Sequence, residues 1–273
     1  MSYRRTTSIS IAGAALVLFA AVPSMAAFVG KASVRYEAPE TEAFQEIMAD
    51  LKARGVLEEV ADSINEEINL PVNLALVAAE CGEVNAFYDP NKRQITLCYE
   101  LMEFFAGLHF TDAEESAEDG EVDGDKVLDS IFGATHFVVY HEAGHALVHL
   151  LNLPITGKEE DAVDQLATLV LINADDDAST NAVLDGAYTF MLQGAASEAE
   201  EEGAELAFWD EHSLDPQRFY NITCWMLGSD PETFASFVED EMLPEARAVR
   251  CPGEWEQISN AWGTLLKPYF KKK

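Results

Sequence analysis

Basic residues are scarce in this chain. Its 273 residues include 17 Lys and Arg against 49 Asp and Glu, which gives a formal net charge of −32. Nucleic acids and anionic membrane surfaces bind proteins through positive charge, so we expect neither as a partner. The three lysines at 271–273 are too few to change this. The negative charge favours solubility and, more weakly, cationic substrates or a salty environment that screens carboxylate repulsion.

Long hydrophobic runs are missing after the first 26 residues. The apolar stretch at 9–22 is too short to span a bilayer comfortably. It follows Arg4 and Arg5 and precedes small residues at 24–26, so residues 1–26 are typical of a secretory signal peptide. We therefore expect an exported protein, periplasmic or secreted, with no stable membrane anchor after cleavage.

Cysteine is limited to four residues, and no two of them have C-x-x-C spacing, which argues against a cysteine zinc site. In an exported protein, cysteines are typically paired as disulfides, with free buried thiols as the alternative. Cys81 and Cys98 flank a predicted hairpin, whereas Cys224 and Cys251 both lie in the C-terminal part of the chain. Of the three possible pairings we favour Cys81–Cys98 and Cys224–Cys251.

The segment from His141 to His145 reads HEAGH, an H-E-x-x-H pattern. Residues four apart lie on one face of a helix, so His141 and His145 can bind one metal ion from adjacent turns. Glu142, one step round the helix, can reach a water on that ion. A zinc hydrolase needs this set of two imidazoles, a carboxylate base and an open coordination position. Zinc acidifies the water and polarises the scissile carbonyl.

A catalytic zinc usually takes a third protein ligand, often a glutamate. Pro154 ends the first helix, and residues 156–159 predict a capping box at the start of a second helix. The capping box occupies Glu159 and leaves Glu160 free as the third ligand. Asp164 lies four residues further on the same face, where its carboxylate can hold the free ring nitrogen of a ligand histidine.

The order of the predicted elements, strands first and helices afterwards, indicates an α+β fold. We expect one domain at 27–273, with an N-terminal lobe at about 27–152 and a helical lobe at about 153–273. An acidic surface insertion is expected at 112–125. The predicted strands are 29–36, 72–79 and a hairpin of 84–88 with 94–99, and the predicted helical segments are 41–69, 100–108, 126–151, 156–172, 180–192, 215–227, 230–242 and 253–266.

Three segments resemble one known family. They are 81–101, the HEAGHA and GKEEDAVDQLA sequences around the motif, and FWDEHSLDPQRFYNITCW at 208–225. Together they resemble the bacterial exported "putative metallopeptidase" family, which is grouped with the zincins, and HExxH followed by ExxxD resembles the gluzincin branch. The resemblance covers most of the chain. It implies a zincin-like fold and one catalytic Zn²⁺, but not a known substrate. We expect a peptide or protein substrate.

The resemblance also implies roles for a strand and for a further side chain. In zincins an edge strand beside the catalytic helix pairs with an extended peptide, and 85–88 or 94–99 are the candidates here. Gluzincins often use a histidine or tyrosine after the ligands to stabilise the oxyanion. His212 is our candidate, with Arg218 or Tyr220 as alternates and an ordinary surface or core histidine as the competing interpretation.

The remaining histidines are interpreted as structural. His149 lies two turns from His141, so one ion cannot easily bind both of them together with His145. His109 and His136 have no motif around them.

The sequence thus predicts an exported zinc-dependent peptidase, with Glu142 as general base and zinc on His141, His145 and Glu160. Two alternatives stay open: a zincin-fold binding module without turnover, and a metal-dependent amidase acting on cell-wall peptides. The intact Glu142 argues against the binding module, because a protein without turnover has no chemical need for that base. The motif residues could also be ordinary helix residues, since motif matches have false positives.

Overall fold

The computed structural model describes residues 30–117, 120–200 and 208–272. The predicted signal peptide lies outside these residues. In chain order, the elements are β1 (Ala32–Tyr36), α1 (Glu42–Arg54), α2 (Val56–Glu67), β2 (Leu74–Ala79), β3 (Ala86–Asp89), β4 (Gln94–Cys98), α3 (Tyr99–Ser116), α4 (Gly124–Leu151), α5 (Glu159–Ile172), α6 (Asp177–Glu200), α7 (Asp215–Ser229), α8 (Ser236–Glu239), α9 (Glu245–Ala248) and α10 (Cys251–Leu266).

The strands form one sheet in the order β1-β2-β4-β3. The first three of these pair in parallel, whereas β3 pairs antiparallel with β4 and forms one edge of the sheet, with β1 at the other. β2 lies inside the sheet and is almost entirely buried, as its apolar sequence LALVAA leads one to expect. The hairpin turn is fixed by Asp89, whose carboxylate accepts hydrogen bonds from the backbone N–H groups of Asn91 and Lys92.

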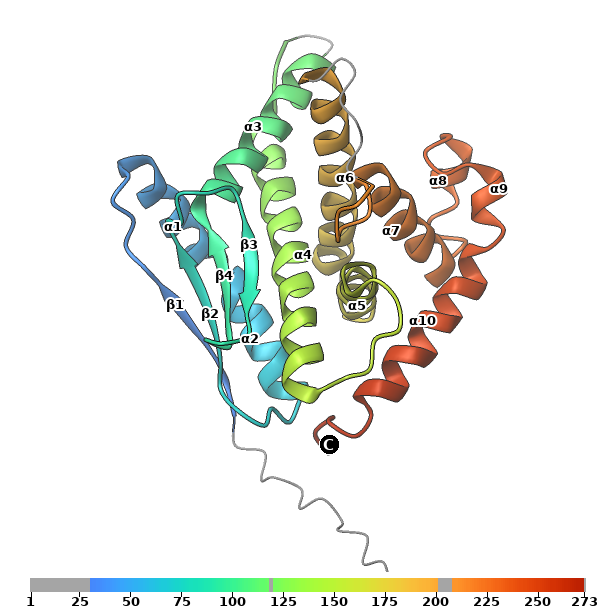
Figure 1. Cartoon of the computed structure of the whole chain (residues 1–273). Coiled ribbons are helices and arrows are strands. Elements are labelled where there is room, and N and C mark those ends of the chain that lie inside the picture. Colours follow the sequence, from blue (N-terminus) through green and yellow to red (C-terminus); the bar gives the residue numbers. More distant parts are fainter. Residues whose placement is uncertain (1–29, 118–119, 201–207, 273) are drawn as a thin grey trace, which may run out of the picture.

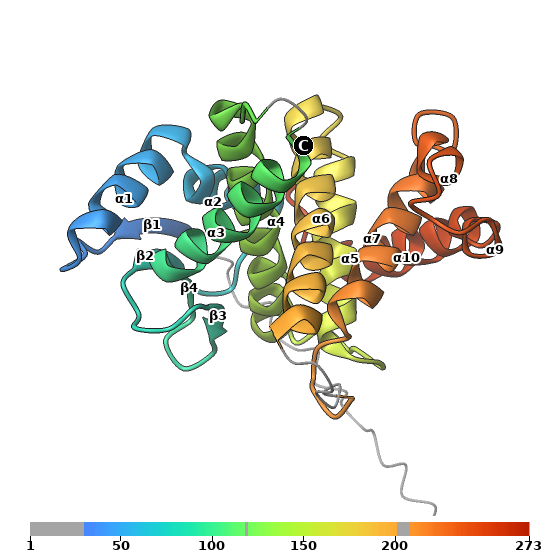
Figure 2. The same cartoon turned by 90° about the horizontal axis from the view of Figure 1, so that it is seen from above.

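The long helix α4 lies at the centre of the molecule. The sheet with α1, α2 and α3 lies on one side of it, and α5, α6, α7 and α10 lie on the other (Figures 1 and 2). Side chains are buried around most of the circumference of α4, which is typical of a helix that packs on all sides. The α+β prediction is confirmed, and α4 brings the HEAGH segment into the core.

A glycine inside the motif controls how close α5 comes to α4. A Cβ atom added at Gly144 would lie 2.7 Å from the Cβ atom of Val163, which is closer than two such atoms can approach. Because Gly144 has no side chain, α5 packs directly against the motif turn of α4. The first turns of α5 thereby lie beside the two motif histidines.

Both expected disulfides are present in the structure, Cys81–Cys98 and Cys224–Cys251. The first joins the segment after β2 to the end of β4, and the second joins α7 to the start of α10. Each is expected to stabilise the fold by roughly 2–4 kcal/mol, mainly by restricting the unfolded chain.

Three predicted elements differ from the observed ones. The helical segment predicted at 41–69 is divided into α1 and α2 at Gly55, which adopts a left-handed conformation. α3 continues into the segment predicted as an acidic insertion, because it packs on α6 and the Tyr188 hydroxyl donates to the Asp112 carboxylate at 2.7 Å. The helix predicted at 230–242 is reduced to turns and α8, because the Asp230 side chain accepts hydrogen bonds from backbone N–H groups ahead of it.

Asp185 on α6 is a half-buried carboxyl group packed against α4. It lies so close to Gly133 that a Cβ atom there would be 2.1 Å from Asp185 Oδ2. Burial raises the pKa of Asp185 to about 7, against a hydrogen bond with Ser130 that lowers it. The folded-state pKa is therefore above the ordinary value. The protonated group stabilises the fold at low pH, and this contribution is lost as the pH rises towards and through the folded pKa.

We therefore expect Asp185→Asn to raise the free energy of unfolding by about 2 kcal/mol at pH ~8, roughly half of what the full pKa change would give, because the group is partly solvated. At pH ~4 the wild-type group is protonated, so the substitution should change stability little. Urea unfolding at the two pH values measures the difference. An equal effect at both would show that the carboxyl group does not titrate with folding.

Candidate metal centre

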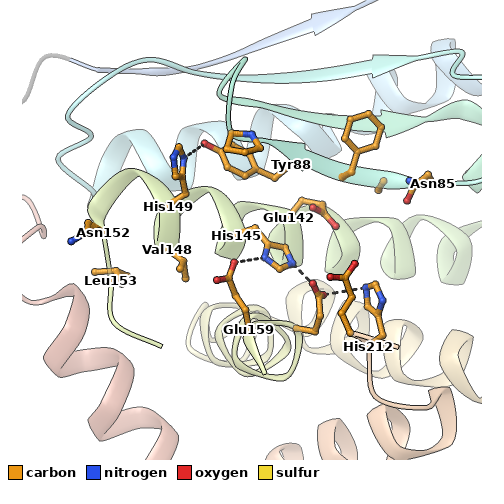
Figure 3. A pocket seen from close by; sticks show the side chains of 15 residues that line it. Asn85, Tyr88, Glu142, His145, Val148, His149, Asn152, Leu153, Glu159 and His212 are labelled. Atoms are coloured by element: carbon orange, nitrogen blue, oxygen red, sulfur yellow. Dashed lines mark hydrogen bonds and ion pairs between the residues drawn. The ribbon is translucent and has the colours of Figure 1, made fainter. Parts of the chain in front are cut away.

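The HEAGH motif lies on two adjacent turns of α4, as the four-residue spacing predicts. The His141 and His145 rings lie with their centroids 5.0 Å apart. The Nε2 atoms of both point to one oxygen of Glu160 on α5, at 3.1 Å from His141 and 3.2 Å from His145. His212, from the segment before α7, reaches the same oxygen with its Nε2 atom at 3.1 Å (Figure 3). The structure thus brings together the predicted ligands and His212.

Each of these three histidines has a carboxylate on its other ring nitrogen. An ionised carboxylate only accepts hydrogen bonds, so each Nδ1 atom is the donor and each Nε2 atom faces the shared point. This arrangement is typical of metal-binding histidines, whose orientation and tautomer are fixed by such partners. The pairs are His141 with Asp164 at 2.6 Å, His145 with Glu159 at 2.8 Å, and His212 with Asp210 at 3.1 Å.

Asp164 is itself held by a buried arginine. The Nε and Nη2 atoms of Arg218 each donate to one Asp164 oxygen at 2.8 Å, and the guanidinium also lies over the Phe190 ring. Burial alone would raise the pKa of the Asp164 carboxyl, but the Arg218 charge and the His141 ring hold that pKa well below its ordinary value. Asp164 thus fixes the His141 ring through its Nδ1 atom, and Arg218 compensates the charge of the Asp164 carboxylate.

The electrostatics of the cluster favour a cation. Burial opposes charge on His145, yet its hydrogen bonds to Glu160 and Glu159 raise its pKa to about 9. The contact with Glu160 is the main cause that raises the pKa of His212. Burial alone would raise the pKa of Glu160, but its contacts with the three imidazoles hold that pKa far below its ordinary value. The Glu160 oxygen therefore attracts positive charge at the point where the Nε2 atoms meet.

Glu142 differs from the other carboxylates of the site. Its side chain is buried, with Oε1 4.0 Å from His141 Nε2, and it makes no hydrogen bond within the described part of the chain. Burial raises the pKa of Glu142, against the nearby histidines. Glu142 is thus a carboxylate next to the cluster whose oxygens are available to a water or a substrate group.

A cavity of about 660 Å³ opens on the cluster. Strand β3 forms one wall, α4 with Glu142 and His145 forms another, and Glu211 and His212 border it as well. The Tyr88 hydroxyl lies 2.8 Å from His149 Nδ1 and joins β3 to α4 (Figure 3). His149 therefore contacts the strand, in keeping with the structural role predicted for it.

The residues present fit a zinc ion. Zinc prefers imidazole nitrogen, thiolate and carboxylate ligands in a compact set of four. Ligand atoms of His141, Glu160 and His212 all lie within 4.8 Å of one another, and His145 approaches the same Glu160 oxygen. Cys81 and Cys98 lie similarly close to Glu100, but those two cysteines form a disulfide.

The capping-box prediction at 156–159 was wrong. Lys158 is the N-cap of α5 and no side chain of the described residues caps the helix, because the loop after Pro154 continues past Thr156. Glu159 is thereby free to accept from His145. Glu159 and Glu160 are adjacent at the start of α5, so their side chains point in different directions. This adjacency in the sequence could have indicated that both contact the same histidine cluster.

The sequence predicted a different role for Arg218 and gave no role to Asp210. Arg218 was considered as an alternate to His212 at the oxyanion, but it is buried and bound to Asp164. Tyr220, the other alternate, is 41% exposed and does not border the cavity. Asp210 was not singled out, although it lies two residues before His212.

Two other histidines, His109 and His136, are buried away from the cluster, in keeping with structural roles. His109 Nε2 lies 2.8 Å from the Thr189 hydroxyl.

One of the three comparisons with known proteins found a match. A family model with the description "Putative metallopeptidase" matches residues 36–266, which is most of the chain. No curated protein and no solved structure matches it. Within the described residues, none of the helices is both long and apolar enough to cross a membrane.

Proposed function

We propose, from the premise that this chain belongs to the family described as "Putative metallopeptidase", that it is an exported zinc-dependent peptidase. The proposal is supported by the convergence of histidine Nε2 atoms on Glu160, beside a Glu142 carboxylate that makes no hydrogen bond within the described residues. The two disulfides are compatible with export, because such bonds persist in oxidising compartments.

His141, His145 and Glu160 would hold the ion, the ligand set typical of this class of catalytic zinc. When bound, zinc supplies a Lewis acid that acidifies water and polarises a carbonyl group. Asp164 and Glu159 keep the two imidazoles in the tautomer that presents Nε2.

Glu142 would act as the general base. Its carboxylate borders the cavity beside His141, where it can accept a proton from the attacking water and pass that proton to the leaving amine. Burial raises the pKa of the Glu142 carboxyl, against the nearby histidines, and a raised pKa makes a carboxylate a stronger base.

The peptide would lie along β3. Of the two strand candidates, β4 pairs with a neighbour on both sides, so it has no free edge and is excluded. β3 is an edge strand and borders the cavity through Ala86, Phe87 and Tyr88. An extended peptide can add to such an edge through main-chain hydrogen bonds and present a scissile bond to Glu142.

Metal analysis tests the ligand assignment. The purified protein is expected to bind about one zinc per chain, as a three-ligand catalytic site does. Glu160→Ala should lose that zinc, whereas Glu159→Ala, which removes a carboxylate that only orients His145, should weaken binding by about 10–100-fold. Zinc titration against a chromophoric chelator measures both. Full zinc binding by Glu160→Ala together with loss in Glu159→Ala would show that the third ligand is the other glutamate.

A further inference from the structure

We infer that His212 is a ligand of the same metal ion, so that the resting centre contains three imidazoles and Glu160. This inference rests on the proposed function, because it concerns the zinc assigned there. It gives His212 a different role from the oxyanion donor that the family resemblance implied, and the two roles predict opposite results.

The position of His212 favours the ligand role. A donor to the oxyanion needs space for the carbonyl oxygen between its own nitrogen and the metal. His212 Nε2 instead lies 3.1 Å from Glu160 Oε2, the same distance as that from His141 Nε2. His212, His141 and Glu160 offer ligand atoms that all lie within 4.8 Å of one another. His212 thus lies among the ligands rather than across the cavity from them.

The partner of the other ring nitrogen supports the same role. Asp210 Oδ1 accepts from the backbone N–H of His212 at 2.8 Å and lies 3.1 Å from its Nδ1 atom. With the Nδ1 hydrogen held by Asp210, a neutral His212 ring presents its Nε2 lone pair to a metal. Nε2 is also the ring nitrogen that contacts Glu160, so the nitrogen that would bind zinc already faces the other ligands. The pairing repeats, from a third element, what Asp164 does for His141.

The loop that presents His212, residues 208–214, is attached to the start of α5. Lys158 Nζ donates to the backbone oxygens of Asp210 and His212 at 3.2 and 3.1 Å. The Ser213 hydroxyl donates to Asp161 at 2.7 Å. These bonds lie on both sides of Glu160 in the sequence, so the loop and the ligand carboxylate are positioned together.

Exposure distinguishes His212 from the other two imidazoles. Its side chain is 46% exposed, compared with 5% for His141 and 15% for His145. Four protein ligands close a tetrahedral zinc site, whereas a catalytic site keeps one position open. His212, as the most exposed of the four, is the ligand that leaves when a substrate enters the cavity. The 208–214 loop then controls access to the metal, because its release removes His212 and opens the fourth coordination position for reaction.

Zinc affinity of the full chain tests the inference. His212→Ala is expected to weaken zinc binding by about 10–100-fold or more, measured by competition with a chromophoric chelator. His149→Ala is the matched control, because it removes another histidine of the same cavity that contacts Tyr88 instead of Glu160. It should leave zinc affinity unchanged. Circular dichroism should show both variants folded, since both side chains are exposed.

The cobalt-substituted protein gives a second readout. Wild type should show the strong visible absorption of a four-coordinate centre and change little when azide is added. His212→Ala should bind azide with a clear spectral change, and free imidazole should restore the wild-type spectrum.

Unchanged zinc affinity and cobalt spectrum in His212→Ala, together with a lower kcat, would overturn the inference in favour of the oxyanion role and leave the proposed function intact. A wild-type protein that binds no zinc at all would overturn both.

Discussion

Glu142→Gln is expected to lower peptide hydrolysis by about 100-fold or more, the usual contribution of a general base. The side chains of Glu and Gln are nearly isosteric, so the fold should be kept. Zinc content should also be unchanged, because Glu142 Oε1 lies 4.0 Å from His141 Nε2, outside the cluster of converging atoms. The comparison requires kcat/KM on a cleaved peptide and zinc content on the same samples.

Glu245→Gln provides a control for this experiment, because it makes the same chemical change on an exposed residue of α9 that does not border the cavity. It should retain wild-type activity. Activity of Glu142→Gln within a few-fold of wild type, at full zinc content, would remove Glu142 from the mechanism without affecting the metal assignment.

Arg218→Met is expected to have the largest effect on stability. Methionine fills much of the same space but leaves the buried Asp164 carboxylate without its charge partner, which should lower the free energy of unfolding by about 3–5 kcal/mol. Asp164 also orients His141, so zinc affinity should fall by about 10–100-fold. Denaturant unfolding and chelator competition measure the two effects.

The double variant Arg218→Met with Asp164→Asn separates charge from packing. Asparagine has no charge to compensate, so most of the lost stability should return, while zinc affinity should stay low because the carboxylate partner of His141 is missing. If the double variant is as unstable as the single one, the cost comes from packing around Phe190 rather than from the unpaired charge.

The convergence of the side chains at the candidate metal centre could be predicted because the pattern behind it is local. His141, His145, Glu160 and Asp164 follow helical spacing, and each helix places its own pair on one face without help from the rest of the chain. Glu159 was misassigned because the start of α5 depends on where the preceding loop ends. The capping-box prediction placed the N-cap at Thr156, two residues before the observed N-cap Lys158. The helix boundary decided the role of that side chain.

Tertiary contacts determined what the sequence pattern could not show. The ion pair of Arg218 with Asp164 joins residues 54 apart along the chain, and no local sequence pattern around either residue predicts it. The hairpin of β3 and β4 was predicted from its turn, but which strand has the free edge depends on the pairing of β4 with β2. The extension of α3 likewise depends on its packing against α6.

The most direct test of the proposed peptidase activity is cleavage of a peptide library by the zinc-loaded wild-type protein, with and without a chelator. Cleavage is expected to stop on chelation and to return when zinc is added back, since a bound ion would provide the Lewis acid beside Glu142. A protein with one zinc per chain that cleaves no peptide in a broad library would contradict the proposed activity. That result would favour a zinc-binding module without turnover, or an amidase that acts on cell-wall peptides outside the library.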